Sequence, residues 1–138
     1  MEQPKIITNF EYNGASFYFD AEDVECMEKY AAAAQKFEKA SKELDADATE
    51  EENALESKVR KMRLYCQNIR TLFDDILGPG AGLAICGERL NARTHTDAYA
   101  AFIEFAYEQA DKGMASRTHI ADLYVSRAEN RRSKQMKK

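Results

Sequence analysis

The 138-residue sequence has few of the residues that form covalent cross-links or metal sites. Its three cysteines, Cys26, Cys66 and Cys86, lie far apart without a CxxC pair, and an odd number does not suit a disulfide framework. Neither of the two histidines, His95 and His119, has a second ligand at the i, i+4 spacing that a helical metal site uses. We therefore expect reduced, buried thiols, no metal ion and no cofactor.

Long apolar runs are also missing. The longest, such as residues 98–103, are far shorter than the roughly 20 residues that cross a bilayer. Residues 1–5 do not form a positively charged leader followed by an apolar segment, so we expect no secretion signal. These features together predict a cytoplasmic protein with no membrane contact.

Charge is unevenly distributed along the chain. The net charge is -4, but residues 127–138 hold six basic residues against one acidic residue, so this tail is +5 and the remainder is -9. A basic tail can bind nucleic acid or an acidic partner. Because it lacks interleaved aromatic residues, we expect a frayed or disordered, solvated tail that follows a single domain at residues 1–126.

Residues 6–19 have the pattern of a β-hairpin. Two short apolar runs flank Asn13-Gly14, the pair that best supplies the positive φ angles of a type I′ turn. A two-residue loop would place Phe10 opposite Phe17 and gather the aromatic side chains of Phe10, Tyr12, Phe17 and Phe19 on one face. An isolated hairpin is marginal in water, so this face should pack on helices or on a second subunit.

Helical periodicity follows the hairpin. Asp20 suits an N-cap, and a first long helix should occupy residues 21–46 with apolar positions that include Tyr30 and Phe37. The acidic stretch at residues 45–52 favours a turn, and one continuous helix over residues 20–77 is the alternative.

The strictest pattern lies between Leu55 and Ile76. Apolar residues there alternate steps of four and three, which is the 3.5-residue repeat of a coiled-coil contact. This seam consists of Leu55, Val59, Met62, Cys66, Ile69, Phe73 and Ile76. Three glycines and a proline at residues 78–82 then make helix continuation costly. Periodicity alone fits either core packing or a partner-binding surface.

The remaining sequence predicts further helices. We expect a short helix at residues 83–90, a helix at residues 97–111, a stop or bend at Gly113 and a last helix from about Ser116. The predicted fold class is mainly α, with a short N-terminal β-hairpin followed by a bundle of about four helices, two of them long.

No motif in the sequence indicates catalysis. The glycine-rich segment lacks the lysine and hydroxyl of a phosphate-binding loop and follows a helix rather than a strand. Asp74 and Asp75 are adjacent, so on a helix their side chains point about 100° apart and do not readily share a substrate atom. We therefore predict no catalytic residue and no enzyme activity.

Residues 6–110 resemble the tail assembly chaperones of long-tailed phages and prophages of Gram-positive bacteria. The similar parts are the YNG hairpin, EKY in an acidic helix, a charged central helix, IRTLFDDILGPGAGLAICGERLN and AYAAFIEFA. The family often has a bulky aromatic residue where Leu77 and Cys86 stand here. The most specific part of the resemblance comprises Phe73, Asp74, Asp75, Gly78, Gly80, Gly87 and Asn91.

The resemblance implies a non-enzymatic protein that binds the long helical tape measure protein and assists tail tube polymerisation. Its partners would be the tape measure protein and the tail tube protein, and we expect a homo-oligomer. The candidate partner-binding or self-association residues are Phe10, Phe17, Phe19, Tyr30, Phe37, Leu55, Val59, Met62, Ile69 and Phe73. The alternative hypothesis is a small regulatory nucleic-acid-binding protein that uses the basic tail.

Overall fold

The structure, a computed structural model, describes residues 5–46 and 54–136, without the side chains of residues 128–130 and 132–136. Its elements in chain order are β1 (Asn9–Tyr12), β2 (Ala15–Tyr18), α1 (Val24–Ala46), α2 (Ala54–Leu77), α3 (Ala81–Cys86) and α4 (Ala92–Met136). The predicted fold class is confirmed, since a short antiparallel hairpin precedes four helices. No helix in the described ranges combines the length and hydrophobicity needed to cross a membrane.

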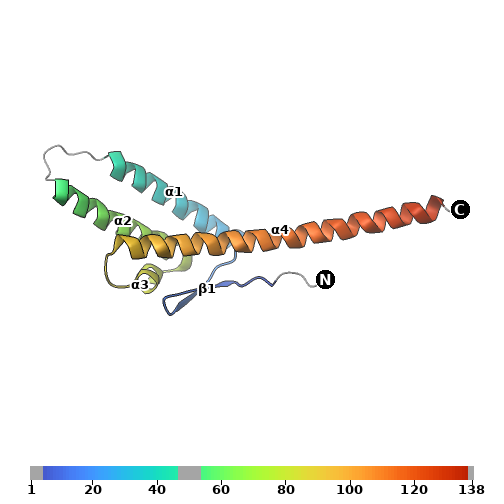
Figure 1. The fold of residues 1–138 in the computed structure, drawn as a ribbon, viewed down its shortest axis with the longest axis horizontal. Helices are drawn as coiled ribbons and strands as arrows, with labels where there is room; N and C mark the ends of the chain where they lie inside the picture. Colours follow the sequence, from blue (N-terminus) through green and yellow to red (C-terminus); the bar gives the residue numbers. More distant parts are fainter. Residues whose placement is uncertain (1–4, 47–53, 137–138) are drawn as a thin grey trace.

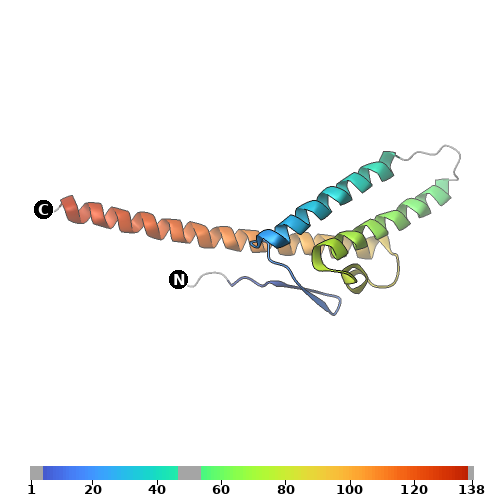
Figure 2. The ribbon, with the colours of Figure 1, turned by 180° about the vertical axis from the view of Figure 1, so that it is seen from behind.

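The elements are arranged around the first half of α4. Helices α1 and α2 lie side by side and project from one end of the molecule, while the β-hairpin and α3 lie beneath α4 (Figure 1). The second half of α4 extends in the other direction, away from every other element, and the opposite view shows the same arrangement (Figure 2). The molecule therefore has a packed body with a helical projection at each end.

The N-terminal hairpin has the predicted register. Phe10 pairs with Phe17, and the turn residues Asn13 and Gly14 have φ angles of 52° and 80°, as a type I′ turn requires. Phe10 and Phe19 are buried in the core. The hairpin therefore covers its aromatic face with helices of its own chain.

A buried glutamine fixes the hairpin to α4. The side-chain amide of Gln109 donates hydrogen bonds to the carbonyls of Ile7 and Phe19, both at 2.7 Å, and its oxygen accepts one from the amide of Ala21 at 2.9 Å. Gln109 is only 3% exposed, and its bond to the Phe19 carbonyl is buried while the other two are partly buried. This residue therefore ties the chain segments before and after the hairpin, at its open end, to α4.

The core is centred on Phe102 of α4. Its ring contacts the rings of Phe10, Phe19, Tyr30 and Phe73, with centroids 5.0–6.0 Å apart. Three of these four contacts are edge-to-face, the geometry that aromatic quadrupoles favour. One side chain thus joins the hairpin segment, α1 and α2 to α4.

The predicted stop or bend at Gly113 is wrong, because α4 is one helix from Ala92 to Met136. Gly113 is buried against Glu22, and a Cβ at this position would overlap the Glu22 carboxylate. Glu22 in turn forms an ion pair with Arg117 at 2.6 Å. The glycine therefore allows close approach of the α1 entry segment, and the tertiary contact outweighs a helix cost of about 1 kcal/mol.

Other boundaries differ in smaller ways. The short helix expected at residues 83–90 lies at Ala81–Cys86, and residues 127–136 form the last turns of α4 where we expected a frayed or disordered tail. Helices α1 and α2 are separate elements that pack side by side, so the favoured prediction of two helices within residues 20–77 is confirmed. The turn expected at residues 45–52 lies mostly outside the described residues, as do residues 137–138.

The central position of Phe102 predicts a large loss of stability in the Phe102→Ala variant. Removing this buried ring should lower the free energy of unfolding by about 3–5 kcal/mol, measured by chemical denaturation. The control is Tyr107→Ala on the same helix, whose side chain is 69% exposed and whose loss should cost no more than about 0.5 kcal/mol. Equal effects in the two variants would contradict this account of the core.

Candidate functional site

The seam on α2 divides into a buried half and an exposed half. Cys66, Ile69, Phe73 and Ile76 are buried in the body. The preceding seam residues are exposed on the surface, with Leu55 at 68%, Val59 at 52% and Met62 at 40%. We call these three residues the α2 strip.

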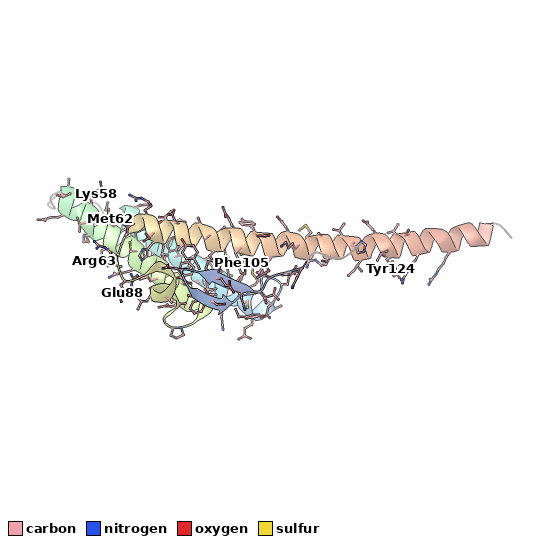
Figure 3. All side chains as sticks on the ribbon, turned by 60° about the horizontal axis from the view of Figure 1, so that its bottom comes forward. Lys58, Met62, Arg63, Glu88, Phe105 and Tyr124 are labelled. Atoms are coloured by element: carbon pink, nitrogen blue, oxygen red, sulfur yellow. The ribbon has the colours of Figure 1, made fainter. Side chains whose placement is uncertain are left out.

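Among the described residues, the other helices pack on other parts of α2 and leave the α2 strip largely exposed. The first turn of α4 meets α2 at Tyr65, whose hydroxyl is 2.6 Å from the Thr96 hydroxyl, and α2 continues beyond this point. Figure 3 shows Met62 on the end of α2 that extends past the start of α4. Helix α1 packs on another side of α2, where Ala40 and Leu44 line a groove together with Leu64.

Basic side chains surround the α2 strip. An open groove of about 430 Å³ is lined by Leu55, Glu56, Val59, Arg60 and Arg63. Lys58 also lies on this end of α2, as Figure 3 shows. The surface therefore combines an apolar stripe at helical spacing with positively charged flanks, which suits an amphipathic helix with acidic flanks.

A buried arginine–histidine contact holds α2, α4 and the segment between them together. Arg70 Nε donates to His95 Nε2 at 3.0 Å, and Arg70 Nη2 donates to the Gly87 carbonyl at 2.5 Å. His95 is fully buried, and its Nδ1 lies 2.7 Å from the Asn91 carbonyl. Since arginine can only donate, Nε2 must accept and Nδ1 must carry the proton. These partners require a neutral imidazole.

The electrostatics of His95 agree with this geometry. Burial lowers the pKa of His95, and the charge of Arg70 lowers it further, while the bond to Asn91 acts in the opposite direction. Both ring nitrogens have partners in the neutral form. Protonation would add a second proton at Nε2, which would then face the Arg70 N–H and could no longer accept its hydrogen bond. His95 therefore acts as a structural, uncharged link between helices.

The residues that carry the family resemblance form the turn between α2 and α4. Asp74 Oδ1 accepts a hydrogen bond from the Gly82 amide at 2.7 Å, which fixes the start of α3 on α2. Gly78, Gly80 and Gly87 have φ angles of 117°, 88° and 85°, a region that favours glycine. Asn91 caps α4 by accepting from the Thr94 amide at 3.1 Å.

The adjacent aspartates have separate structural partners. Asp74 bonds to Gly82, whereas Asp75 is exposed and forms an ion pair with Lys36 of α1 at 3.3 Å. The two carboxylates therefore diverge, as the helical spacing predicted. Within residues 5–46 and 54–136, no group of three or more acidic, histidine or cysteine side chains is placed to hold a metal ion.

Two of the three cysteine thiols are shielded from solvent. All three are free, and Cys66 and Cys86 are buried as expected, whereas Cys26 is only partly buried, because it lies on the first turn of α1 at the edge of the core. Burial raises the pKa of the two buried thiols, to about 11 for Cys86, although the charge of Arg70 opposes the shift. Thiols in such surroundings are protonated at neutral pH and are poor nucleophiles.

The predicted partner-binding residues lie in two different environments. Only the α2 strip presents largely exposed side chains, and the others belong to the core or its edge: Phe10, Phe17, Phe19, Tyr30, Phe37, Ile69 and Phe73. The hydrogen bond between Arg70 and His95 was not predicted from the sequence. The two residues are 25 positions apart, and no local sequence pattern indicates that their side chains meet.

Comparison with known families assigns residues 13–138 to DUF6673, described as a family of unknown function. The chain belongs to this family. Curated proteins and solved structures gave no significant match. The DUF6673 match covers the hairpin turn, all four helices and the α2 strip, so the candidate site lies within the family's own sequence region.

The buried His95 predicts a loss of stability in mild acid. Because its pKa is lowered in the folded state, the unfolded chain binds a proton first as the pH falls below about 6.5, and the free energy of unfolding should decrease. Denaturation at a series of pH values should show a shallower decrease in His95→Gln, since glutamine does not titrate. The Tyr107→Ala control, which removes an exposed side chain and no histidine, should keep the wild-type slope. Identical slopes in wild type and His95→Gln would contradict the prediction.

The contact between α3 and α2 predicts that Gly82 does not tolerate a side chain. A Cβ at Gly82 would overlap the backbone carbonyl of Arg70, which cannot rotate away. Gly82→Ala should therefore lower the melting temperature and cost about 1–3 kcal/mol or more. The Leu83→Ala control removes a half-exposed neighbour and should change stability far less. A Gly82→Ala variant as stable as wild type would show that α3 is loosely held.

Proposed function

We propose that this protein is a non-enzymatic assembly chaperone that binds an amphipathic helix of its partner along the α2 strip. The observation that carries the proposal is the solvent-exposed continuation of a core seam at Leu55, Val59 and Met62. A row of exposed apolar residues at coiled-coil spacing is the feature that helix-binding surfaces use. Exposed apolar rows on folded proteins commonly mark interaction sites.

The charges around the strip favour a particular kind of partner. Arg60 and Arg63 line the same groove as Leu55 and Val59. A partner helix with acidic residues beside its apolar stripe would gain both apolar burial and favourable electrostatics. In a long helical protein whose sequence repeats in heptads, such an apolar stripe continues along the helix, so the protein offers many binding sites of this kind.

The sequence resemblance supports the tape measure protein as this partner, with the tail tube protein as a second. In this proposal the chaperone acts in the cytoplasm of a bacterial host. It covers the apolar stripe of the tape measure protein until tube subunits replace it. The scaffold for this role is the α2–α3 turn, because the motif residue Asp74 accepts a hydrogen bond from the Gly82 amide and so joins α3 to α2.

The proposal predicts that charges placed in the α2 strip abolish partner binding. In the double variant Val59→Glu and Met62→Glu, two exposed apolar side chains are lost, and the affinity for a co-expressed tape measure protein should fall on the order of 100-fold or more. Co-purification and the soluble fraction of the tape measure protein report the result.

Tyr107→Glu is the control, since Tyr107 is a 69% exposed apolar residue on α4, away from the strip. It should leave binding unchanged. Circular dichroism would verify that all variants keep their helical content. Unchanged co-purification of the tape measure protein with the double variant would refute the proposed site.

A further inference from the structure

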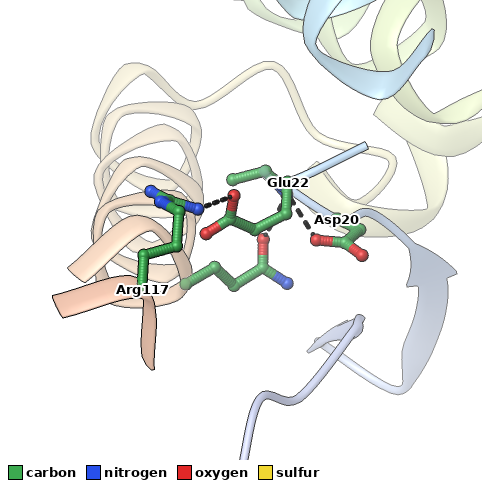
Figure 4. A network of polar contacts seen from close by, with 5 residues as sticks. Asp20, Glu22 and Arg117 are labelled. Carbon is green, nitrogen blue, oxygen red and sulfur yellow. Dashed lines mark hydrogen bonds and ion pairs between the residues drawn. The ribbon is translucent and has the colours of Figure 1, made fainter. Parts of the chain in front are cut away.

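The second half of α4 leaves the body as a free helix. The ion pair between Glu22 and Arg117 joins the α1 entry segment to α4 (Figure 4). Among the side chains that the structure describes, none beyond Arg117 forms a hydrogen bond or an ion pair with another element. The helix continues to Met136 and points away from the other elements, as Figure 1 shows. We call residues 118–136 the free half of α4.

The charges on the free half are sorted by helix face. Successive residues of an α-helix are rotated by about 100°, which places the positions of Arg127, Arg131 and Lys134 within an arc of about 60°. We call these three residues the basic stripe. The two acidic residues of the free half, Asp122 and Glu129, occupy positions about 140–180° away from Arg127 and Arg131. The helix register therefore keeps acidic residues off the basic stripe.

The arginines of the basic stripe have no acidic neighbour at helical spacing. The positions three and four residues before and after Arg127 are Leu123, Tyr124, Asn130 and Arg131. The corresponding positions around Arg131 are Arg127, Ala128, Lys134 and Gln135. Like charges at i, i+4 destabilise a helix, and Arg127 and Arg131 are both exposed. A negatively charged ligand would relieve this repulsion.

An exposed aromatic ring lies beside the basic stripe. Tyr124 is 78% exposed, and its position is about 60° around the helix from Arg127. Figure 3 shows Tyr124 on the free half. The sequence favoured a solvated tail because residues 127–138 contain no aromatic residue, but the continuous helix brings this ring to the same face. Basic side chains combined with a ring on which a base can stack are typical of surfaces that bind single-stranded nucleic acid.

We propose that the basic stripe and Tyr124 bind single-stranded nucleic acid, with the arginines on phosphate groups and a base stacked on the Tyr124 ring. This inference is independent of the partner proposed for the α2 strip. The acidic remainder of the chain opposes such binding only weakly, because Arg127 lies ten residues beyond Arg117, about 15 Å along the helix. This distance exceeds the Debye length of about 8 Å at physiological ionic strength.

The distribution of side chains disfavours other anionic ligands. A helix that lies on a membrane separates its basic and apolar residues onto different faces. Here Ile120 and Tyr124 share the face of the basic stripe, whereas Val125 lies about 160° away from Arg127. Acidic side chains of a protein would satisfy the charges alone. Every nucleotide carries both a phosphate and a flat base, so a single strand satisfies the charges and the ring together.

The first experiment measures binding of the full chain to a fluorescein-labelled single-stranded oligonucleotide by fluorescence anisotropy, with RNA and DNA versions of one sequence. Wild type should bind at least one of them with a Kd on the order of 10 μM or less at about 50 mM salt. The double variant Arg127→Gln and Arg131→Gln should bind on the order of tenfold more weakly. Its slope of log Kd against log salt should be smaller by about 1.4, since each phosphate contact on a single strand contributes about 0.7.

The matched control for this variant is the double variant Arg89→Gln and Arg93→Gln. It removes the same charge from two exposed arginines of the body that are also four residues apart. This control should keep the wild-type affinity and salt slope. Circular dichroism would verify that every variant keeps its helical content.

The second experiment separates stacking from charge. Tyr124→Leu should weaken binding about tenfold or more, because the base loses its aromatic platform. Tyr124→Phe keeps the ring and should bind within about twofold of wild type. Tyr107→Leu is the control, since Tyr107 is 69% exposed on the packed half of α4, and it should leave binding unchanged.

Four results would overturn the proposal. The first is the absence of binding to either oligonucleotide at low salt. The second is an unchanged salt slope in the arginine double variant, which would place the contact elsewhere. The third is equal weakening by Tyr124→Phe and Tyr124→Leu, which would exclude stacking. The fourth is equal competition by a duplex of the same sequence, by polyglutamate or by phosphatidylglycerol vesicles, which would indicate a general anion surface. Because partner binding is measured through the α2 strip, failure here would leave that proposal unaffected.

Discussion

Packing around the Phe102 ring is the interaction on which the rest of the structure depends. The hairpin, α1 and α2 each place an aromatic side chain against it, through Phe10, Tyr30 and Phe73. Phe102 is therefore the residue at which all of these elements meet within one hydrophobic core. The body is compact around Phe102, and α2 and α4 extend from it in different directions.

This central core explains why two helices carry apolar residues that it does not cover. The core uses the last seam residues of α2 and the first half of α4. Each helix keeps the same apolar spacing beyond the core, through Met62, Val59 and Leu55 on α2 and through Ile120 and Leu123 on α4. Burying apolar surface is worth on the order of 25 cal/mol per Å², so these exposed residues are the ones that a binding partner could bury with a gain in free energy.

The turn between α2 and α4 gives these projections their directions. Arg70 links α2 to His95 at the start of α4, while Asp74 holds α3 in place through the Gly82 amide. Neither contact presents reactive groups on the surface. The residues that carry the family resemblance therefore have a structural role, because they hold the turn that sets the directions of α2 and α4.

Local signals in the sequence determined the hairpin, the helical class and the strict seam. Asn13-Gly14 defines its turn through backbone sterics, and the alternation of Leu55, Val59 and Met62 defines a helix face, because these effects act over a few residues. Tertiary structure alone decided that Gly113 lies within a continuous helix and that Arg70 meets His95, since both depend on segments distant in the chain. It also decided which part of the seam is buried. Periodicity identifies an apolar face on a helix. The positions of the other elements then determine which part of that face is buried and which part stays exposed.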